Sequence, residues 1–483
     1  MNGECESRYP VTLPGEVPSA PLLKPADRVL VPFTADDAAG HRVCPMSWGQ
    51  KEIWQAMINQ RNWLPMGGTK PLPAGTTLQD VAEELRYLVS RFPSMRTRLH
   101  YEGDAWPLQE LFDSGEIALE VFDADAAGPA ETASAVEAQY RNTDYNFAED
   151  WPVRMAVVRQ DGEPAYMVAI MCHLVGDGVG VEFMLRDVAV LSTEPQTGLQ
   201  QVDQAEWQAS PAGLRQSAGA LRYWEKILRT IPPRPLPDSA DPRSPRHWRA
   251  EYDSPALRRV LPVLAERTGA SASSVLLAMY SVALARITGI NPVVSRTIVS
   301  NRFRPGLATP VCQIAQGGIC ALDVAGLTFD EAVDRAQRDT ITMFKYAYFD
   351  PEQVTALFQQ VSQERGPDLN ISCFVNDRRG PDLRSPNAAN AESGAIAAGQ
   401  PAEDGEPTES VFRWLPARDI PVERLFIHFD DTAIGIMITV CADTHFLSPA
   451  HMEALARGME AVVLEAEYDP AAPTRVETAA AHV

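Results

Sequence analysis

The chain has 483 residues, of which 45% are hydrophobic, and this is enough for two domains with full-sized cores. The 64 acidic residues outnumber the 42 lysines and arginines, and a net charge of −22 would repel a phosphate backbone, which argues against nucleic acid as a partner. No apolar run approaches the ~20 residues that cross a bilayer, and the N-terminus lacks the order of a secretory signal, so we expect a cytoplasmic protein with no membrane partner.

The N-terminal half begins with residues 1–25, whose Pro, Glu and Ser content predicts a disordered leader. Apolar residues at helical spacing predict amphipathic helices over 46–60, where Ser47 is a suitable N-cap, and over 77–92. Strands are expected over 95–101, 153–160 and 166–173, and a further helix over 179–191. The stretch AYMVAIMCHLVGDGVGVEF, residues 165–183, is therefore predicted to form a strand, a glycine-rich turn and a helix.

The C-terminal half contains a similar mixture of elements. The sequence predicts helices near 221–228 and over 271–289 and 449–466, and strands over 291–302, 369–377, 425–430 and 433–443. Residues 231–248, rich in proline, are expected to be a surface connection, residues 377–410 a long mobile insertion and residues 469–483 a disordered tail. The two inventories favour an α/β (α+β) fold of two similar lobes, residues 26–205 and 206–468.

A cluster of chemically useful residues follows the strand predicted over 166–173. Successive side chains point to opposite faces of a strand, so we expect Cys172 to face a core while His173 faces a cleft. A neutral imidazole there can take a proton from an amine or alcohol that attacks a carbonyl, which suits acyl transfer, although a lone histidine at a strand end is more often structural. Asp177 is well placed to be held by a cation, and Gly176, Gly178 and Gly180 permit tight backbone geometry.

The seven cysteines are scattered without CxxC or Cys/His ligand spacing, so we expect reduced thiols and no metal site. A Cys172 nucleophile activated by His173 is disfavoured, because adjacent residues of a strand cannot hydrogen bond to each other through their side chains.

Several segments resemble, in the same order, the motifs of the condensation domains of nonribosomal peptide synthetases. His173, Asp177 and Gly178 match the second histidine, the aspartate and the glycine of the HHxxxDG motif. CPMSWGQKEIW is similar to the family's opening motif, and the RHExLRTxF region is matched through Arg91, Arg96, Thr97 and Arg98. Three later motifs are resembled by YNFAEDWPVRMAVV, LRYWEKIL and VVSRTIVSNRFRPGL. The resemblance extends over residues 26–466.

This resemblance implies two lobes similar to chloramphenicol acetyltransferase, arranged as a V-shaped pseudodimer with a central tunnel. It implies that His173 lies midway along the tunnel, that a structural Asp177 pairs with Arg302 from the second lobe, and that Gly178 brings backbone close to a thioester carbonyl. The donor would be an acyl group on the phosphopantetheine arm of an acyl or peptidyl carrier protein in trans, or on coenzyme A, with no tightly bound cofactor. A small-molecule amine or alcohol would accept it, giving an amide or ester in the biosynthesis of a natural product such as an antibiotic.

Basic side chains near these motifs could recognise the donor. Arg96 and Arg98, and also Arg91, Arg378 and Arg379, could bind the phosphate of phosphopantetheine or an acidic carrier protein, or could be solvated surface residues.

The sequence departs from the family pattern at three places. Cys172 replaces the first histidine, Asn301 replaces the glycine of the "GR" segment, and residues 312–324 lack the family's Phe, Asn and Arg, so acceptor recognition is expected to differ. Because no adenylation or carrier domain fits in 483 residues, we expect a free-standing enzyme. The alternative is a non-catalytic docking module that recruits another biosynthetic protein, which the retained His173 disfavours. No segment resembles the EGHGR of epimerising members or the DFGWG of plant-type alcohol acyltransferases.

Overall fold

The computed structural model describes residues 9–15, 22–36, 40–103, 105–366, 368–380, 409–418 and 423–477. Contacts divide the chain into two compact units. Unit 1 comprises the described residues up to Leu214 together with Ser300–Ala315, and unit 2 comprises Arg215–Val299 and the described residues from Gln316 onward. The segment Ser300–Ala315, hereafter the crossing segment, therefore belongs by its contacts to unit 1, although the sequence-based division assigns it to the second lobe.

Unit 1 is built around a five-stranded sheet of order β2-β7-β9-β10-β4, in which β7 and β9 are parallel and the other neighbours antiparallel. A three-stranded sheet, β3-β6-β5, and the pair β1-β8 accompany it. The strands are β1 (Thr12–Leu13), β2 (Asp27–Thr34), β3 (Arg42–Pro45), β4 (Pro65–Pro71), β5 (Thr97–His100), β6 (Leu108–Leu111), β7 (Ser114–Asp123), β8 (Tyr145–Asn146), β9 (Val153–Gln160) and β10 (Glu163–Cys172). The helices are α1 (Trp48–Gln60), α2 (Leu78–Arg91), α3 (Pro129–Asn142), α4 (Gly178–Val190) and α5 (Gln201–Ala209), with 3-10 turns η1 (Pro93–Arg96) and η2 (His173–Val175).

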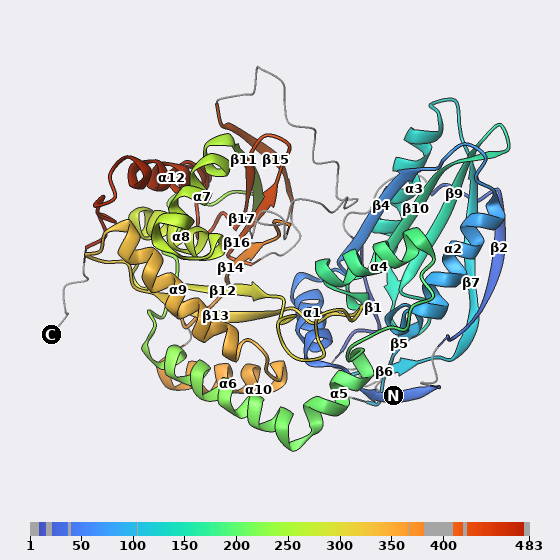
Figure 1. Cartoon of the computed structure of the whole chain (residues 1–483), viewed down its shortest axis with the longest axis horizontal. Coiled ribbons are helices and arrows are strands. Elements are labelled where there is room, and N and C mark those ends of the chain that lie inside the picture. The colour runs from blue at the N-terminus through green and yellow to red at the C-terminus, as the bar shows by residue number, and fades with distance from the viewer. Residues whose placement is uncertain are drawn as a thin grey trace, which may run out of the picture. The chain divides into compact units, whose positions relative to one another are not determined.

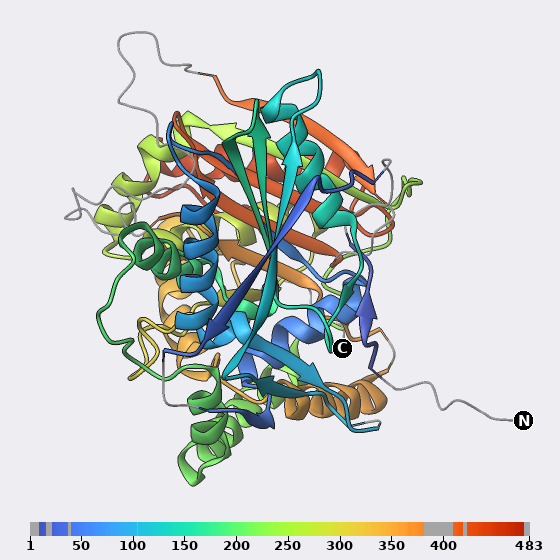
Figure 2. The ribbon, with the colours of Figure 1, turned by 90° about the vertical axis from the view of Figure 1, so that its right-hand side faces the viewer.

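Two apolar clusters fill unit 1 on opposite faces of its larger sheet. One combines side chains of the sheet with α2 and α4, including Leu85 and Met184. The other combines the sheet with α1 and α3, including Trp54 and Val136. Figure 2, which faces unit 1, shows α2 in blue running beside the strands. Successive side chains of β10 alternate between these two clusters. Packing on both faces of the sheet therefore fixes the end of β10, and with it the position at which the chain continues into residue 173.

Unit 2 contains a seven-stranded sheet of order β13-β12-β14-β16-β17-β11-β15, with β12, β14 and β16 mutually parallel as neighbours and the remaining pairs antiparallel. Its strands are β11 (His247–Ser254), β12 (Val293–Val299), β13 (Gln316–Leu322), β14 (Cys373–Asp377), β15 (Val411–Arg418), β16 (Leu425–Asp431) and β17 (Ile436–Asp443). Its helices are α6 (Pro211–Thr230, which begins in unit 1), α7 (Pro255–Thr268), α8 (Ala272–Thr288), α9 (Phe329–Tyr346), α10 (Pro351–Arg365) and α12 (Pro449–Tyr468).

The core of unit 2 gathers α7, α8, α9 and α12 against one face of this sheet, and Figure 1 shows α8 and α12 on that side. A smaller cluster places α6 and α10 with β12 and β13. No single helix among the described residues is long and apolar enough to span a membrane. The pair α7 and α8 has the length and composition together, but the two helices are bent by 106° and α8 is buried from Ser274 to Ala285 in the core.

Both ends of the described chain are more structured than the sequence predicts. Tyr9 and Leu13 are buried in the cluster that contains α1, and β1 pairs with β8, because these apolar side chains complete that core. The predicted leader is therefore wrong for residues 9–15, while residues 1–8 and 16–21 lie outside the described residues. At the other end Val476 is buried in the core of unit 2 and the Thr474 hydroxyl donates to the Val324 carbonyl, so the predicted tail is wrong up to residue 477.

Most of the predicted insertion over 377–410 lies outside the described residues, namely residues 381–408. Asp377, its first predicted residue, is the last residue of β14. The predicted strand over 95–101 begins late: residues 95 and 96 belong to η1, where Pro93 fixes a helical turn, and only Thr97–His100 extend.

Candidate active site

The motif predicted as strand, turn and helix has that structure. β10 ends at Cys172, η2 turns the chain at His173, and α4 begins at Gly178 with Asp177 as its N-cap. Cys172 is 1% exposed and belongs to the cluster of α1 and α3, as the alternation of side chains predicts. Burial raises the pKa of its thiol to about 12, so Cys172 is not a nucleophile at neutral pH.

Asp177 is buried and accepts four hydrogen bonds. Its Oδ1 receives the N–H of Gly180 at 2.8 Å, which caps α4, and Nη2 of Arg302 at 2.6 Å. Its Oδ2 receives the N–H groups of Ile314 and Ala315, both at 3.1 Å. The predicted ion pair between Asp177 and Arg302 is thus present, with 7% of each side chain exposed. It lies within unit 1, because the crossing segment packs there, and the expected origin of Arg302 in the second lobe is wrong in this respect.

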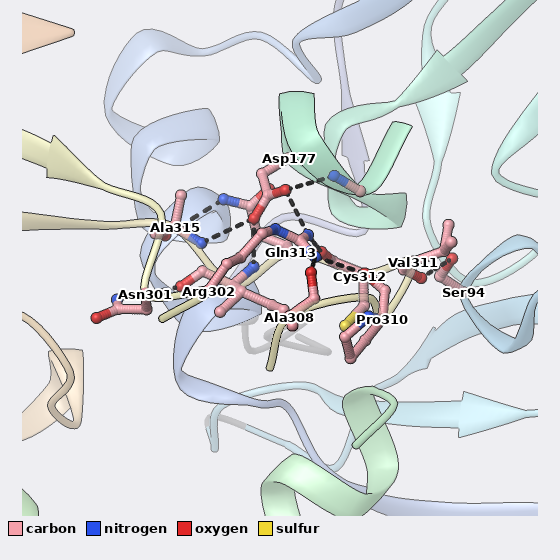
Figure 3. Close-up of polar contacts among 12 residues, drawn as sticks. Ser94, Asp177, Asn301, Arg302, Ala308, Pro310, Val311, Cys312, Gln313 and Ala315 are labelled. Carbon is pink, nitrogen blue, oxygen red and sulfur yellow. Dashed lines mark hydrogen bonds and ion pairs between the residues drawn. The ribbon is translucent and has the colours of Figure 1, made fainter. Parts of the chain in front are cut away.

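Arg302 also fixes the crossing segment that carries it. Nη1 donates to the carbonyl of Pro310 at 2.9 Å, and Nη2 lies 3.4 Å from the carbonyl of Cys312. The hydroxyl of Ser94 donates to the carbonyl of Val311 at 2.9 Å. Figure 3 shows the contacts gathered around Asp177 and Arg302, and the separate contact between Ser94 and Val311. Both members of the buried ion pair therefore also hydrogen bond to backbone groups. These additional hydrogen bonds offset the free-energy cost of removing the two charges from water.

One glycine and one asparagine make this arrangement possible. A methyl group on Gly180 would lie 2.8 Å from Nη2 of Arg302, so a side chain there would displace the guanidinium. Asn301 has a φ of +59°, a left-handed conformation that asparagine tolerates better than most residues, and this explains why it can stand where the family has glycine. Gly176 is extended, and a methyl group on Gly178 would meet open space, so neither is required for the turn itself.

His173 is partly buried at the start of this turn. Its Nδ1 is enclosed and has no hydrogen-bond partner of good geometry among the described residues. Burial lowers the pKa of the imidazole, while the backbone of His173, the carboxylate of Asp177, the backbone of Gly176 and the Gln313 side chain, in that order, oppose the decrease. The ring is consequently neutral at pH 7 and can accept a proton.

The arginines predicted to dock the donor are mostly engaged. Arg96 is fully buried and donates to the backbone carbonyls of Phe112 and Ser90, so its prediction as a phosphate ligand is wrong. Arg98 is half-buried with its guanidinium 3.6 Å from the centre of the Trp151 ring, and desolvation lowers its pKa. It is held as a stacked cation rather than as a free surface charge.

The remaining arginine candidates form ion pairs. Arg91 binds Asp187, Arg378 binds Asp430, and Arg379 binds Asp377 with 1% of its side chain exposed. Arg91 and Arg379 are therefore structural, and the alternative of solvated surface charges is also wrong for them. Within the described residues, no group of three or more His, Cys, Asp or Glu side chains could hold a metal ion.

Sequence reasoning missed Gln313, which lies next to His173. Its side chain is 4% exposed, and its amide acts on the imidazole. No local pattern marks this residue, because it reaches the histidine from 140 positions away through the crossing segment. The only available signal was its position in residues 312–324, where the sequence departs from the family motif.

The family model of the condensation domain matches residues 66–376. Among curated proteins, the chain is 25% identical over 285 residues to phosphinothricin tripeptide synthetase PhsC of Streptomyces viridochromogenes, covering 54% of this chain and 26% of PhsC. It is also 25% identical over 294 residues to surfactin synthase subunit 2 of Bacillus subtilis, covering 58% of this chain and 8% of that protein. The chain thus spans about a quarter or less of these curated relatives.

Solved structures share the fold over nearly the whole chain. The condensation domain of the monacolin K polyketide synthase MokA aligns with a TM-score of 0.67 and 17% identity, over 90% of this chain and 99% of that one. SgcC5 from Streptomyces globisporus aligns with a TM-score of 0.62 and 18% identity, over 89% and 100% of the two chains. The X-domain from teicoplanin biosynthesis aligns with a TM-score of 0.66 and 16% identity, over 90% and 97%. These matches confirm the predicted α/β condensation-type fold.

Proposed function

The chain belongs to the condensation-domain family, and on that premise we propose that it is an acyltransferase that joins a thioester-bound acyl group to an amine or hydroxyl. In this reaction the acceptor nitrogen or oxygen forms a bond to the thioester carbonyl, the carbon–sulfur bond breaks, and the proton lost by the acceptor ends on the departing thiol. The product is an amide or an ester.

The observation that carries this proposal is the environment of His173. The ring is neutral, its Nδ1 is enclosed, and it stands at the turn that Asp177 and Arg302 fix. Nε2 can accept the proton of the attacking N–H or O–H, or hold that group in line with the carbonyl. Proton transfer of this kind contributes ~10²- to 10⁴-fold, and the remainder would come from holding the two substrates together.

The other motif residues have supporting roles in this proposal. Asp177 and Arg302 hold the turn and do not touch substrate. Gly178 leaves open space at the first residue of α4, where the thioester carbonyl could approach the backbone. The donor would be carried by the phosphopantetheine arm of a carrier protein or by coenzyme A, and Arg98 is the remaining candidate of the predicted pair, Arg96 and Arg98, to contact it. The tunnel that would admit both substrates stays a prediction of the resemblance.

The test compares the His173→Ala variant with a matched control, His451→Ala. His451 is an exposed histidine of α12. Intact mass spectrometry follows acyl groups from carrier-protein and coenzyme A thioesters to a panel of amines and alcohols. We expect His173→Ala to lose turnover by at least ~100-fold with an unchanged melting temperature, and His451→Ala to retain it. Full turnover by His173→Ala would end the proposal.

The alternative expected from the sequence is a non-catalytic docking module that recruits another biosynthetic protein. It predicts that no thioester is consumed with any acceptor and that a stable protein complex forms instead. Nδ1 of His173 makes no hydrogen bond of good geometry among the described residues, and an imidazole retained without a strong structural bond at that atom favours the enzyme.

A further inference from the structure

The helix α5 packs on the rest of unit 1 mainly through glutamine side chains. Gln201, Gln204 and Gln208 are at most 4% exposed and, at spacings of three and four residues, lie on one face of the helix. The apolar residues that α5 buries are Val202 and Ala205, and neither belongs to an apolar cluster of either unit in the part of the chain that the structure describes. The inward face of α5 is therefore predominantly polar.

The first and last of these glutamines bond two other elements of unit 1. Nε2 of Gln201 donates to the hydroxyl of Thr97, the first residue of β5, at 3.2 Å. Oε1 of Gln208 accepts from the N–H of Trp48, the first residue of α1, at 2.9 Å. Oε1 of Gln201 and Oε1 of Gln204 are buried and have no hydrogen-bond partner among the described residues. These two oxygens are thus buried without a bond that offsets their loss of contact with water.

The middle glutamine contacts the crossing segment. Nε2 of Gln204 donates to the carbonyl of Leu199 at 2.7 Å and to Sγ of Cys312 at 3.0 Å. The N–H of Leu199 in turn donates to the carbonyl of Gly306 at 2.8 Å. The sulfur of Cys312 points away from Asp177 in Figure 3, and it is buried although Cys312 belongs to no apolar cluster of the described chain. Residues 199–209, hereafter the α5 strap, therefore contribute a glutamine rather than an apolar side chain to the burial of this thiol.

A polar interface of this kind holds a helix weakly. Burial of apolar surface supplies most of the free energy that holds helices in place, and Trp54 of α1 and Leu85 of α2 provide it for those helices. The hydrogen bonds of α5 are exchanged for bonds to water when the helix leaves, so their net contribution is small. The two unpartnered carbonyl oxygens gain bonds to water in the same step. The α5 strap should consequently detach far more often than unit 1 unfolds.

The contacts that fix the motif do not involve the α5 strap. Asp177 bonds Arg302 and the N–H groups of Ile314 and Ala315, and all of these atoms lie outside residues 199–209. We propose that the α5 strap is a releasable cover of the crossing segment, which detaches as a unit, uncovers Cys312 and leaves the sheets and the motif of unit 1 in place. This inference concerns the conformational freedom of the fold beside the motif and goes beyond the proposed function.

Buried thiols allow this opening to be measured. Four of them are at most 1% exposed, and burial raises the pKa of each to about 12, so each reacts with iodoacetamide only after an opening event; they are Cys172, Cys312, Cys320 and Cys373. All except Cys312 lie in apolar clusters and serve as internal controls. In the native wild-type protein, peptide mass mapping should show Cys312 alkylated at least ~100-fold faster than the three controls. Equal rates for all four would overturn the proposal, since Cys312 would then be uncovered only when the core unfolds.

A variant tests whether α5 is what covers the thiol. Gln204→Ala removes both hydrogen bonds of that side chain and should speed the alkylation of Cys312 by a further ~10-fold while the control thiols keep their rates. Gln139→Ala is the matched control, because Gln139 of α3 also forms two hydrogen bonds, both to the backbone of Leu23, and should leave all four rates unchanged. An unchanged Cys312 rate in Gln204→Ala, or equal acceleration of all four thiols, would overturn the proposal. The wild-type comparison decides alone if Gln204→Ala does not fold.

Hydrogen exchange locates the opening. The amides of α5 should report the same opening equilibrium as the alkylation of Cys312, whereas the amides of Ile314 and Ala315 should keep their protection. Amides of α5 that stay protected while Cys312 reacts quickly would place the opening in the crossing segment itself and overturn the proposal. Because neither measurement uses turnover, a failure of the α5 strap to open is distinguished from a failure of the proposed acyl transfer.

Discussion

At the scale of single residues, Asp177 does more than the motif suggests. It caps a helix, pairs with a buried cation and holds two backbone N–H groups of a segment more than a hundred residues away. Four donors converge on two carboxylate oxygens, so each oxygen is used twice. An amide in this place would offer one accepting oxygen and turn an NH₂ group toward other donors.

Asp177→Asn is therefore expected to destabilise the protein by ~3–5 kcal/mol, since it leaves the charge of Arg302 buried without its partner. Asp123→Asn is the control, because Asp123 pairs with Arg159 at the surface with 56% of its side chain exposed. That pair should contribute ~1 kcal/mol or less. Urea denaturation monitored by circular dichroism measures the free energy of unfolding of each variant. An equal loss of stability in Asp177→Asn and Asp123→Asn would contradict the role given to Asp177.

Residue-scale prediction from the sequence succeeded where a local rule applied. The alternation of side chains along a strand placed Cys172 in a core and His173 outside it, and this needs no knowledge of the rest of the fold. The same approach failed for Arg96 and Gln313. Whether an arginine reaches solvent or a backbone carbonyl depends on neighbours such as Phe112, and the approach of Gln313 to His173 depends on where the crossing segment lies.

At the scale of elements, the position of α1 depends on a glycine near its start. Ser47 caps the helix and forms a capping box with Gln50, as the sequence allows one to expect. Gly49 then lets the first turn of α1 lie against the backbone of Gln313, where a methyl group would meet the carbonyl oxygen at 2.1 Å. The helix and the crossing segment can thus pack this closely only because residue 49 is a glycine, which has no side chain.

Gly49→Ala should destabilise the protein by ~1–3 kcal/mol, because backbone must move to admit the methyl group. Gly458→Ala in α12 is the matched control: its methyl group would lie 3.8 Å from Cβ of Ala283, an ordinary contact. Alanine is the better helix former by ~1 kcal/mol, so this variant should gain stability. Thermal melts of the two variants should shift in opposite directions, and a stabilised Gly49→Ala would show that the close approach is wrong.

Elements were predictable where they carry their own signal. The helix after Ser47, the helix after Thr77 and the apolar strand β9 all lie within a residue or two of their predicted bounds. Strands such as β11 were missed, since its residues HWRAEYDS are mostly polar and follow a proline-rich stretch. It becomes a strand by pairing with β17 and β15, which only the assembled sheet provides.

At the scale of the whole molecule, the crossing segment is the notable departure from a simple two-lobe division. Val299 at the end of β12 pairs with Gln316 at the start of β13, so the sheet of unit 2 can close without the residues between them. Those residues instead make their contacts in unit 1. The sequence could suggest two lobes from similar inventories of elements, but a segment that belongs to the other unit leaves no mark in composition or periodicity.

This connectivity predicts that the crossing segment can be loosened without disturbing the sheet on either side of it. Arg302→Met removes the guanidinium that bonds Asp177 and the carbonyl of Pro310. In hydrogen exchange, the amides of Ile314, Ala315 and Gly180 should then exchange at least ~100-fold faster, because they depend on a carboxylate that has lost its cation. Amides in the β12–β13 ladder should keep their protection, and Arg159→Met should leave both regions unchanged. Loss of protection throughout β12 and β13 would mean that unit 2 needs the segment to fold, since its own strand pairing would then be insufficient to close the sheet.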